Sequence, residues 1–84
     1  MSEHGYHIQK IEKGVIGEIS KIQEELDELK DAQNQGVKIM ELVELADLIG
    51  AVELYLEKHH PNTTLEDLIT MKDVTRRAFE NGRR

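Results

Sequence analysis

The most hydrophobic stretch of the chain runs from Ile39 to Leu56, where thirteen of eighteen residues are apolar. The exceptions fall at every third position, and they are Glu41, Glu44, Asp47, Gly50 and Glu53. A helix that is apolar on nearly every side needs burial on most of its surface. A step of three residues lags a helical turn by about 60°, so the exceptions wind around the helix and only neighbours such as Glu44 and Asp47 share a face.

A second apolar stripe precedes this helix. Its residues recur at spacings of four and three, as on one face of a helix, and they are Ile11, Val15, Ile19, Ile22, Leu26 and Leu29. The segment Asn34-Gln35-Gly36 is a typical helix end and turn. The pattern predicts a first helix over about 9–33 and a central helix over about 37–59.

A third helix is predicted over about 63–81. Pro61 ends the central helix, because the residue before a proline avoids the α region. Thr63, with Glu66 three residues later, has the spacing of a capping box. We therefore expect an all-α protomer with a single domain over 9–84. Residues 1–8 are expected to form an N-terminal arm, with His4 and His7 as surface residues.

The central helix of the three is too apolar for its two partner helices to cover. A chain of 84 residues also buries only about 60% of its unfolded surface, so its stability alone is marginal. We expect a homo-oligomer, a dimer or tetramer, in which the protomers assemble into a helical bundle around the 37–59 helices.

Composition narrows the functional classes. The net charge of −6 disfavours general nucleic-acid binding, which needs a basic surface. The absence of cysteine excludes disulfides and thiolate metal sites. The acidic residues within the apolar stretch argue against a membrane span, and nothing resembles a signal peptide, so we expect a cytoplasmic protein.

Carboxylates are the candidate chemistry. Helical projection lets Glu25 and Glu28 of the first helix lean together, whereas Glu24 points away from the apolar stripe. With Glu44 and Asp47 they can form the oxygen-rich site that Mg²⁺ or Mn²⁺ prefers. A solvated acidic face on the first helix, and ion pairs of Glu44 and Asp47 with Lys or Arg, are the alternatives. The chain has no glycine-rich phosphate loop, serine triad or cysteine nucleophile, so metal-assisted chemistry is what remains for an enzyme.

These acidic motifs resemble those of the MazG-like all-α nucleoside triphosphate pyrophosphohydrolases. That superfamily has E-E-x-x-E on one helix, matched by Glu24-Glu25-Leu26-Asp27-Glu28, and E-x-x-D on the next, matched by Glu44-Leu45-Ala46-Asp47. The resemblance covers roughly residues 17–84. It implies a hydrolase that cleaves a ribo- or deoxynucleoside triphosphate between its α and β phosphates, giving the monophosphate and pyrophosphate.

The resemblance also implies roles for individual residues. The metal ligands for Mg²⁺, with Mn²⁺ as a possible substitute, would be Glu25, Glu28, Glu44 and Asp47. Glu24 would orient a metal-bound water. Phosphate-binding residues of a later helix would be Lys72 and Arg76, with Asn81 and Arg84 matching a frequent N-x-x-R ending.

Other interpretations of the basic residues and of the chain stay open. Lys21, one turn before Glu25, is either a further phosphate ligand or a salt-bridge partner of that glutamate. Lys72 and Arg76 share a face with apolar residues, where they would either reach phosphate or extend over the edge of the core. The alternative function is a non-catalytic helical oligomer acting as an adaptor or regulator, and a catalytically inactive relative that still binds nucleotides is a third possibility.

Overall fold

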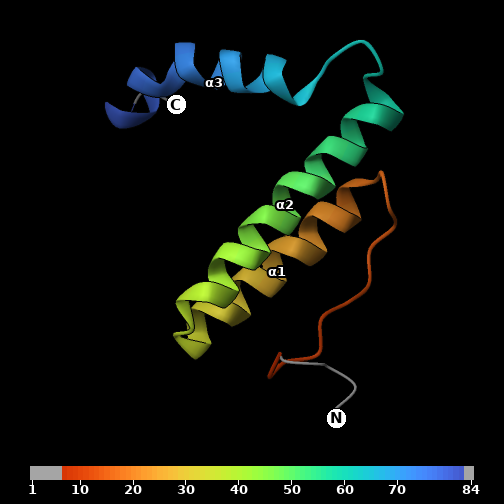
Figure 1. Cartoon of the computed structure of the whole chain (residues 1–84), viewed down its shortest axis with the longest axis vertical. Coiled ribbons are helices and arrows are strands. Elements are labelled where there is room, and N and C mark those ends of the chain that lie inside the picture. The colour runs from red at the N-terminus through yellow and green to blue at the C-terminus, as the bar shows by residue number, and fades with distance from the viewer. Residues whose placement is uncertain (1–6, 83–84) are drawn as a thin grey trace.

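The computed structural model describes residues 7–82, and in this range the protein consists of three helices without a β-strand. These are α1 (Ile19–Gln35), α2 (Lys38–His59) and α3 (Leu65–Glu80). Figure 1 shows α1 and α2 packed side by side as an antiparallel hairpin, while α3 leaves the end of α2 at a steep angle. The all-α, three-helix prediction is confirmed for the protomer.

The α1–α2 hairpin is held together at both ends, by the turn at Gly36 and by ion pairs between the start of α1 and the end of α2. Gly36 adopts a left-handed conformation with φ of 74°, and its N–H donates to the carbonyl of Gln33, as expected for a helix C-terminus. At the opposite end, Glu18 forms ion pairs with Lys58 and with Nε2 of His59, the latter at 3.3 Å. The two helices are thereby fixed in a register that places their carboxylates opposite one another.

The first helix begins at Ile19, so the prediction of a helix from residue 9 is wrong for residues 9–18. Figure 1 shows this stretch as a non-helical segment that runs back alongside α1. Gly14 and Gly17 lower its helix propensity, and Gly17 has φ of 86°, which a helix does not allow. Backbone N–H groups of the segment bond to side chains instead: Gly14 donates to Glu24 and Val15 to Ser20.

The capping box of α3 lies one residue later than predicted, at Thr64 and Asp67. The N–H of Asp67 donates to Oγ1 of Thr64 (3.2 Å), and the N–H of Thr64 donates to Oδ2 of Asp67 (2.9 Å). This reciprocal pair has the geometry that was expected of Thr63 and Glu66. The α3 helix contacts α2 and has no contact with α1.

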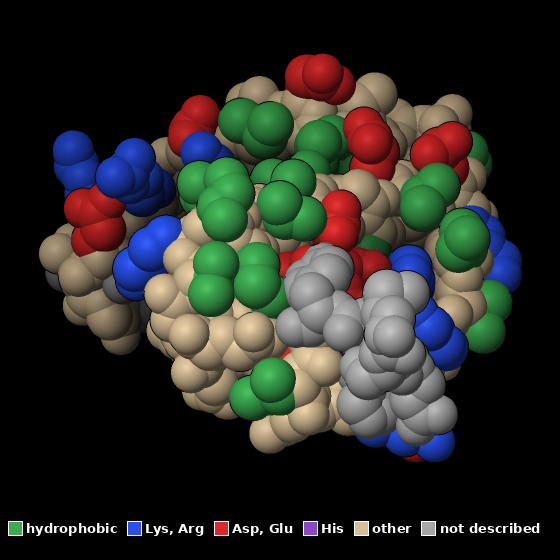
Figure 2. All heavy atoms as spheres, turned by 60° about the horizontal axis from the view of Figure 1, so that its bottom comes forward, with side chains coloured by type: hydrophobic (Ala, Val, Ile, Leu, Met, Phe, Trp, Pro, Cys, Tyr) green, Lys and Arg blue, Asp and Glu red, His purple; other side chains and the backbone are tan. Residues whose placement is uncertain are grey.

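Within the described residues, the buried side chains are mostly ionisable, whereas many large hydrophobic side chains are exposed. The fully buried hydrophobic residues are Ala32, Ala51 and Leu56, whereas buried ionisable residues are more numerous: His7, Glu24, Glu25, Asp31 and Glu44. Many large apolar side chains of α2 and α3 are exposed, among them Ile39, Leu42, Ile49, Ile69, Met71 and Val74. Figure 2 shows hydrophobic side chains gathered on one face beside acidic ones. No helix in the described range combines the length and hydrophobicity needed to cross a bilayer.

Candidate metal centre

Four carboxylates from the two packed helices converge at one place. Glu25 and Glu28 come from α1, Glu44 and Asp47 come from α2, and each offers an oxygen within 4.8 Å of the others. The residues of each pair are three apart, so both side chains of a pair lie on one face of their helix. Antiparallel packing then brings the two faces together. These four residues are called the carboxylate cluster below.

The cluster is buried to an unusual degree for acidic side chains. Glu44 is completely inaccessible to solvent and Glu25 is 5% exposed, whereas Asp47 lies at the exposed edge. Oε2 of Glu25 has no hydrogen-bond partner within the described part of the chain. Burial of an ionised carboxylate oxygen is costly unless a cation or donor compensates it. The arrangement therefore favours a cation at the cluster.

The electrostatics of the cluster point the same way. Burial, together with the neighbouring carboxylates of Glu44 and Glu25, raises the pKa of Glu28 to about 8. Burial and the charges of Glu25 and Glu44 also raise the pKa of Asp47, against a smaller opposing effect of Lys21. A proton is thus held where several negative charges meet. Replacement of that proton by a divalent cation would relieve the repulsion, and oxygen donors in this number suit Mg²⁺ or Mn²⁺.

Lys21 and Glu24 have structural partners at the edge of the cluster. Nζ of Lys21 lies 3.2 Å from Oε1 of Glu24 and 3.2 Å from Oε1 of Glu25. Burial disfavours the charged form of Lys21, but its two glutamate partners outweigh this and raise its pKa. The salt bridge considered from the sequence is therefore present, and a role of Lys21 in phosphate binding stays a prediction.

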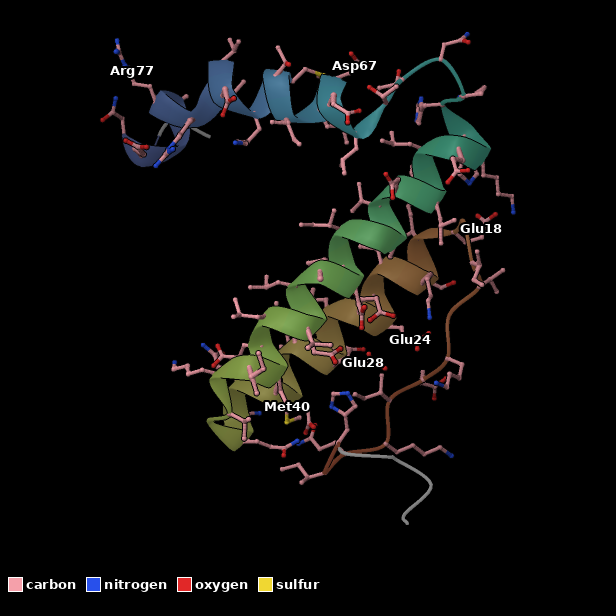
Figure 3. The ribbon with its side chains drawn as sticks, viewed as in Figure 1. Glu18, Glu24, Glu28, Met40, Asp67 and Arg77 are labelled. Carbon is pink, nitrogen blue, oxygen red and sulfur yellow. The ribbon has the colours of Figure 1, made fainter. Side chains whose placement is uncertain are left out.

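Glu24 holds the non-helical segment against α1. Its Oε1 accepts the N–H of Gly14 at 2.8 Å, and its Oε2 lies 3.6 Å from Nζ of Lys13. Although burial opposes ionisation, the Gly14 N–H and Lys21 lower the pKa of Glu24. Figure 3 shows Glu24 and Glu28 on the side of α1 that faces the segment. Glu24 is buried by these contacts and does not point to solvent, and its expected role with water stays a prediction.

His7 is the residue that sequence reasoning missed. It was expected on the surface of an arm, but it is buried, and its Nδ1 lies 2.8 Å from Oδ2 of Asp31. Its Nε2 lies 3.8 Å from Oε1 of Glu44 and 3.9 Å from Oε2 of Glu28. No periodicity marks His7, because the segment that carries it is not helical. The available signal was Asp31, an acidic residue three positions after Glu28 on the same helix face.

The basic residues expected to bind phosphate lie on α3, away from the cluster. Lys72 pairs with Asp73 and Arg76 pairs with Glu80, each at 2.7 Å, and all four side chains are exposed. Asn81 is exposed after the end of α3, and Arg84 lies outside the described residues. Figure 3 shows Arg77, at the far end of the same helix, well separated in space from Glu28. Since α3 does not contact α1, one protomer does not bring Lys72 or Arg76 to the carboxylates.

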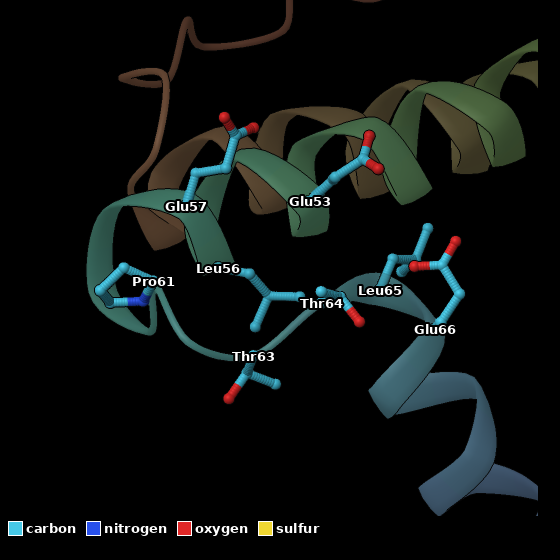
Figure 4. A pocket seen from close by; sticks show the side chains of 8 residues that line it. All are labelled: Glu53, Leu56, Glu57, Pro61, Thr63, Thr64, Leu65 and Glu66. Atoms are coloured by element: carbon cyan, nitrogen blue, oxygen red, sulfur yellow. The ribbon is translucent and has the colours of Figure 1, made fainter.

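A pocket of about 280 Å³ lies between the end of α2 and the start of α3, apart from the cluster (Figure 4). Its lining includes Leu56 and three carboxylates, Glu53, Glu57 and Glu66. Three acidic side chains would repel a triphosphate, so this pocket does not suit the expected substrate.

Comparison of the chain with protein-family models, with curated proteins and with solved structures found no significant match.

Proposed function

We propose that this protein is a Mg²⁺-dependent nucleoside triphosphate pyrophosphohydrolase, which converts a ribo- or deoxynucleoside triphosphate to the monophosphate and pyrophosphate. The observation that carries the proposal is the convergence of Glu25, Glu28, Glu44 and Asp47 at one place, where Glu25 and Glu44 are buried. These are acidic positions of the two MazG-like motifs, which lie on consecutive helices of the chain. Motif and geometry therefore support the same site.

The carboxylates of the cluster would hold the ion. When bound, Mg²⁺ would supply charge neutralisation for phosphate oxygens and a lowered pKa for water. The residues themselves prepare the site: the hairpin fixes Glu44 and Glu25 before any ligand arrives, so little reorganisation is needed. Lys21 compensates part of the negative charge through Glu25.

The phosphate-binding side of the site would come from a second copy of the chain. Lys72 and Arg76 lie on a helix that does not reach the cluster of its own protomer. The same helix and α2 expose apolar side chains, including Leu42, Ile49 and Val74, as an interface between copies would require. We therefore propose a homo-oligomer, a dimer or tetramer, in which α3 of one protomer approaches the cluster of another.

The first test is a panel of ribo- and deoxynucleoside triphosphates incubated with Mg²⁺ and assayed for pyrophosphate and phosphate. Pyrophosphate release is expected, and the ranking of the panel would identify the substrate. Phosphate as the product would refute the assigned reaction. No product from any nucleotide would favour the non-catalytic adaptor.

A matched pair of variants ties the activity to the cluster. Glu44→Gln keeps the shape of the side chain and removes its charge, so it should abolish turnover while the protein stays folded. Glu41→Gln is the control, because Glu41 lies on the same helix but pairs with Lys38 outside the cluster. Mg²⁺ at 100 times its Kd should stabilise the wild type by about 2.7 kcal/mol, as a ligand of the native state does, but should not stabilise Glu44→Gln. Turnover in Glu44→Gln would remove the cluster from the mechanism.

Mixing two inactive variants tests the shared site. If Arg76 acts on the cluster of another protomer, hetero-oligomers of Glu44→Gln and Arg76→Ala contain some intact sites. In a two-fold dimer that exchanges subunits, about a quarter of the wild-type activity should return. A mixture as inactive as its components would refute the shared site, provided that subunit exchange is verified.

A further inference from the structure

The packing of His7 against the carboxylate cluster has no place in the function proposed above. His7 belongs to the non-helical segment, yet it is buried, with 8% of its surface exposed against 5% for Glu25. Two backbone contacts hold the segment there: the N–H of Ile8 donates to Asp31, and the N–H of Gly14 donates to Glu24. The imidazole is thus held over the cluster by α1.

We infer that His7 is a nitrogen ligand of a divalent cation that it shares with Glu28 and Glu44. His7, Glu28 and Glu44 each offer a ligand atom within 4.8 Å of one another. The inference rests on the metal-binding part of the proposed function and is independent of the reaction catalysed. It adds a ligand that the acidic motifs do not contain.

The distances fit an ion between the ligands. Nε2 of His7 is 3.8 Å from Oε1 of Glu44 and 3.9 Å from Oε2 of Glu28. Both separations are too long for hydrogen bonds between these atoms. Two ligand atoms that each lie about 2.1 Å from one ion can be up to about 4.2 Å apart, so both separations are within reach of a common ion.

Asp31 prepares the imidazole for this role. Oδ2 of Asp31 accepts the backbone N–H of Ile8 at 3.1 Å and the side-chain amide N–H of Gln35 at 2.9 Å, so this oxygen is also the acceptor in its contact with Nδ1 of His7. Nδ1 of His7 is then the donor in this contact, and the tautomer with a proton on Nδ1 places a lone pair on Nε2, the nitrogen that faces Glu28 and Glu44. A carboxylate on the far nitrogen is the usual support of a metal-bound histidine, fixing both tautomer and orientation.

The buried oxygen of Glu25 gives a second and independent indication of a cation. Its Oε2 has no hydrogen-bond partner within residues 7–82 and belongs to a residue that is 95% buried, next to Glu28 and Glu44 in the cluster. Carboxylates alone suit Mg²⁺, whereas an added imidazole favours transition metals. The cation class is therefore Mn²⁺, Co²⁺ or Zn²⁺, with Mg²⁺ bound more weakly.

A spectroscopic experiment on the full chain tests the inference without relying on activity. Mn²⁺ is added below one equivalent, and electron spin-echo modulation detects a directly bound ¹⁴N nucleus. The wild type should show imidazole nitrogen, His7→Gln should not, and His59→Gln should match the wild type because His59 lies at the other end of α2. Calorimetry should show a loss of Co²⁺ affinity in His7→Gln of at least the roughly 10–100-fold that removal of a group merely supporting a ligand costs, with a smaller change for Mg²⁺.

The outcomes separate this inference from the proposed function. Bound Mn²⁺ without nitrogen coupling in the wild type would overturn the inference alone. Unchanged or tighter Co²⁺ binding in His7→Gln would also overturn it, since His7 would then be only a counter-ion for the glutamates. Failure to bind any divalent cation would overturn both proposals. Nitrogen coupling without pyrophosphate release would support the metal site and overturn the hydrolase. If His7→Gln does not fold, a wild type without nitrogen coupling still overturns the inference, and a coupling that persists in His4→Gln, His59→Gln and His60→Gln assigns the nitrogen to His7.

Discussion

The charge on Glu28 should make the stability of the metal-free protein depend on pH. Its carboxyl group faces Glu25 on its own helix, Glu44 and Asp47 on α2, and His7 on the non-helical segment. Because the folded pKa of about 8 lies above the ordinary value of 4.5, the neutral form stabilises the fold. That stability is fully present below about pH 4.5 and is lost as the pH rises through about 8. Glu28→Gln keeps a neutral side chain at every pH.

The size of the effect follows from the pKa difference and the exposure of the side chain. A change from 4.5 to about 8 sets an upper bound of about 5 kcal/mol, at about 1.4 kcal/mol for each tenfold change in the acid constant. The Glu28 side chain is 16% exposed, so water screens the neighbouring charges. We therefore expect the free energy of unfolding of the wild type to fall by about 1–2 kcal/mol between pH 5 and 9.

Urea unfolding in EDTA buffers between pH 5 and 9 measures this dependence. Glu28→Gln should show a nearly flat profile, with a small remaining slope from Asp47, and should exceed the wild type in stability at pH 9. Asp27→Asn is the control, because Asp27 pairs with Gln23 outside the cluster and its variant should keep the wild-type slope. A flat wild-type profile, or an unchanged slope in Glu28→Gln, would refute the reasoning.

Three further experiments, each with one or two substitutions, test other parts of the structure. Thr64→Ala should lower the free energy of unfolding by about 1 kcal/mol, because it removes the cap of α3; an unchanged thermal midpoint would contradict that cap. Gly14→Ala places a Cβ 2.2 Å from a backbone oxygen of α1 and should cost about 1–3 kcal/mol in urea unfolding. Gly50→Ala, whose Cβ meets no atom within 4 Å in the protomer, should instead gain up to about 1 kcal/mol. Equal effects of the two alanines would argue against the described path of the segment. Arg76→Ala should reduce kcat/KM about 10–100-fold, as loss of a charged hydrogen bond does, whereas Arg77→Ala should stay near the wild type; equal losses would remove Arg76 as a specific phosphate ligand.

The helix boundaries were predictable from the sequence where local signals, such as a turn-forming segment or the hydrophobic spacing, decide where a helix ends or begins. The Asn34-Gln35-Gly36 segment predicted the end of α1 within two residues, since α1 ends at Gln35 and the left-handed Gly36 follows it. The start of α2 was placed within one residue. The start of α1 was not predictable from the apolar stripe, because Ile11 and Val15 continue the spacing into a segment that is not helical. Side-chain acceptors on α1 bind the amides of that segment, and such a long-range exchange has no signature in local spacing.

The difference between local spacing and long-range contacts also explains which residues of the candidate site could be predicted from the sequence. Glu25 and Glu28 could be paired with Glu44 and Asp47, because each pair has helical spacing and a short turn forces the two helices to be antiparallel. His7 could not be placed in this way, because its position depends on the contact of a non-helical segment with Asp31. Helical spacing therefore finds candidate ligands on helices and misses a candidate ligand carried by a non-helical segment.

Metal binding and assembly should stabilise each other in this protein. The hairpin buries Glu25 and Glu44 where a small domain would normally bury hydrophobic residues, and it leaves Ile39, Leu42 and Ile49 on its surface. A cation at the cluster would remove the repulsion inside the hairpin, and a second copy would cover the apolar side chains outside it. Both ligands bind the same folded hairpin, so each favours the form that the other recognises. We therefore expect Mn²⁺ to lower the protein concentration at which the oligomer forms, and Glu44→Gln to remove that effect in sedimentation experiments.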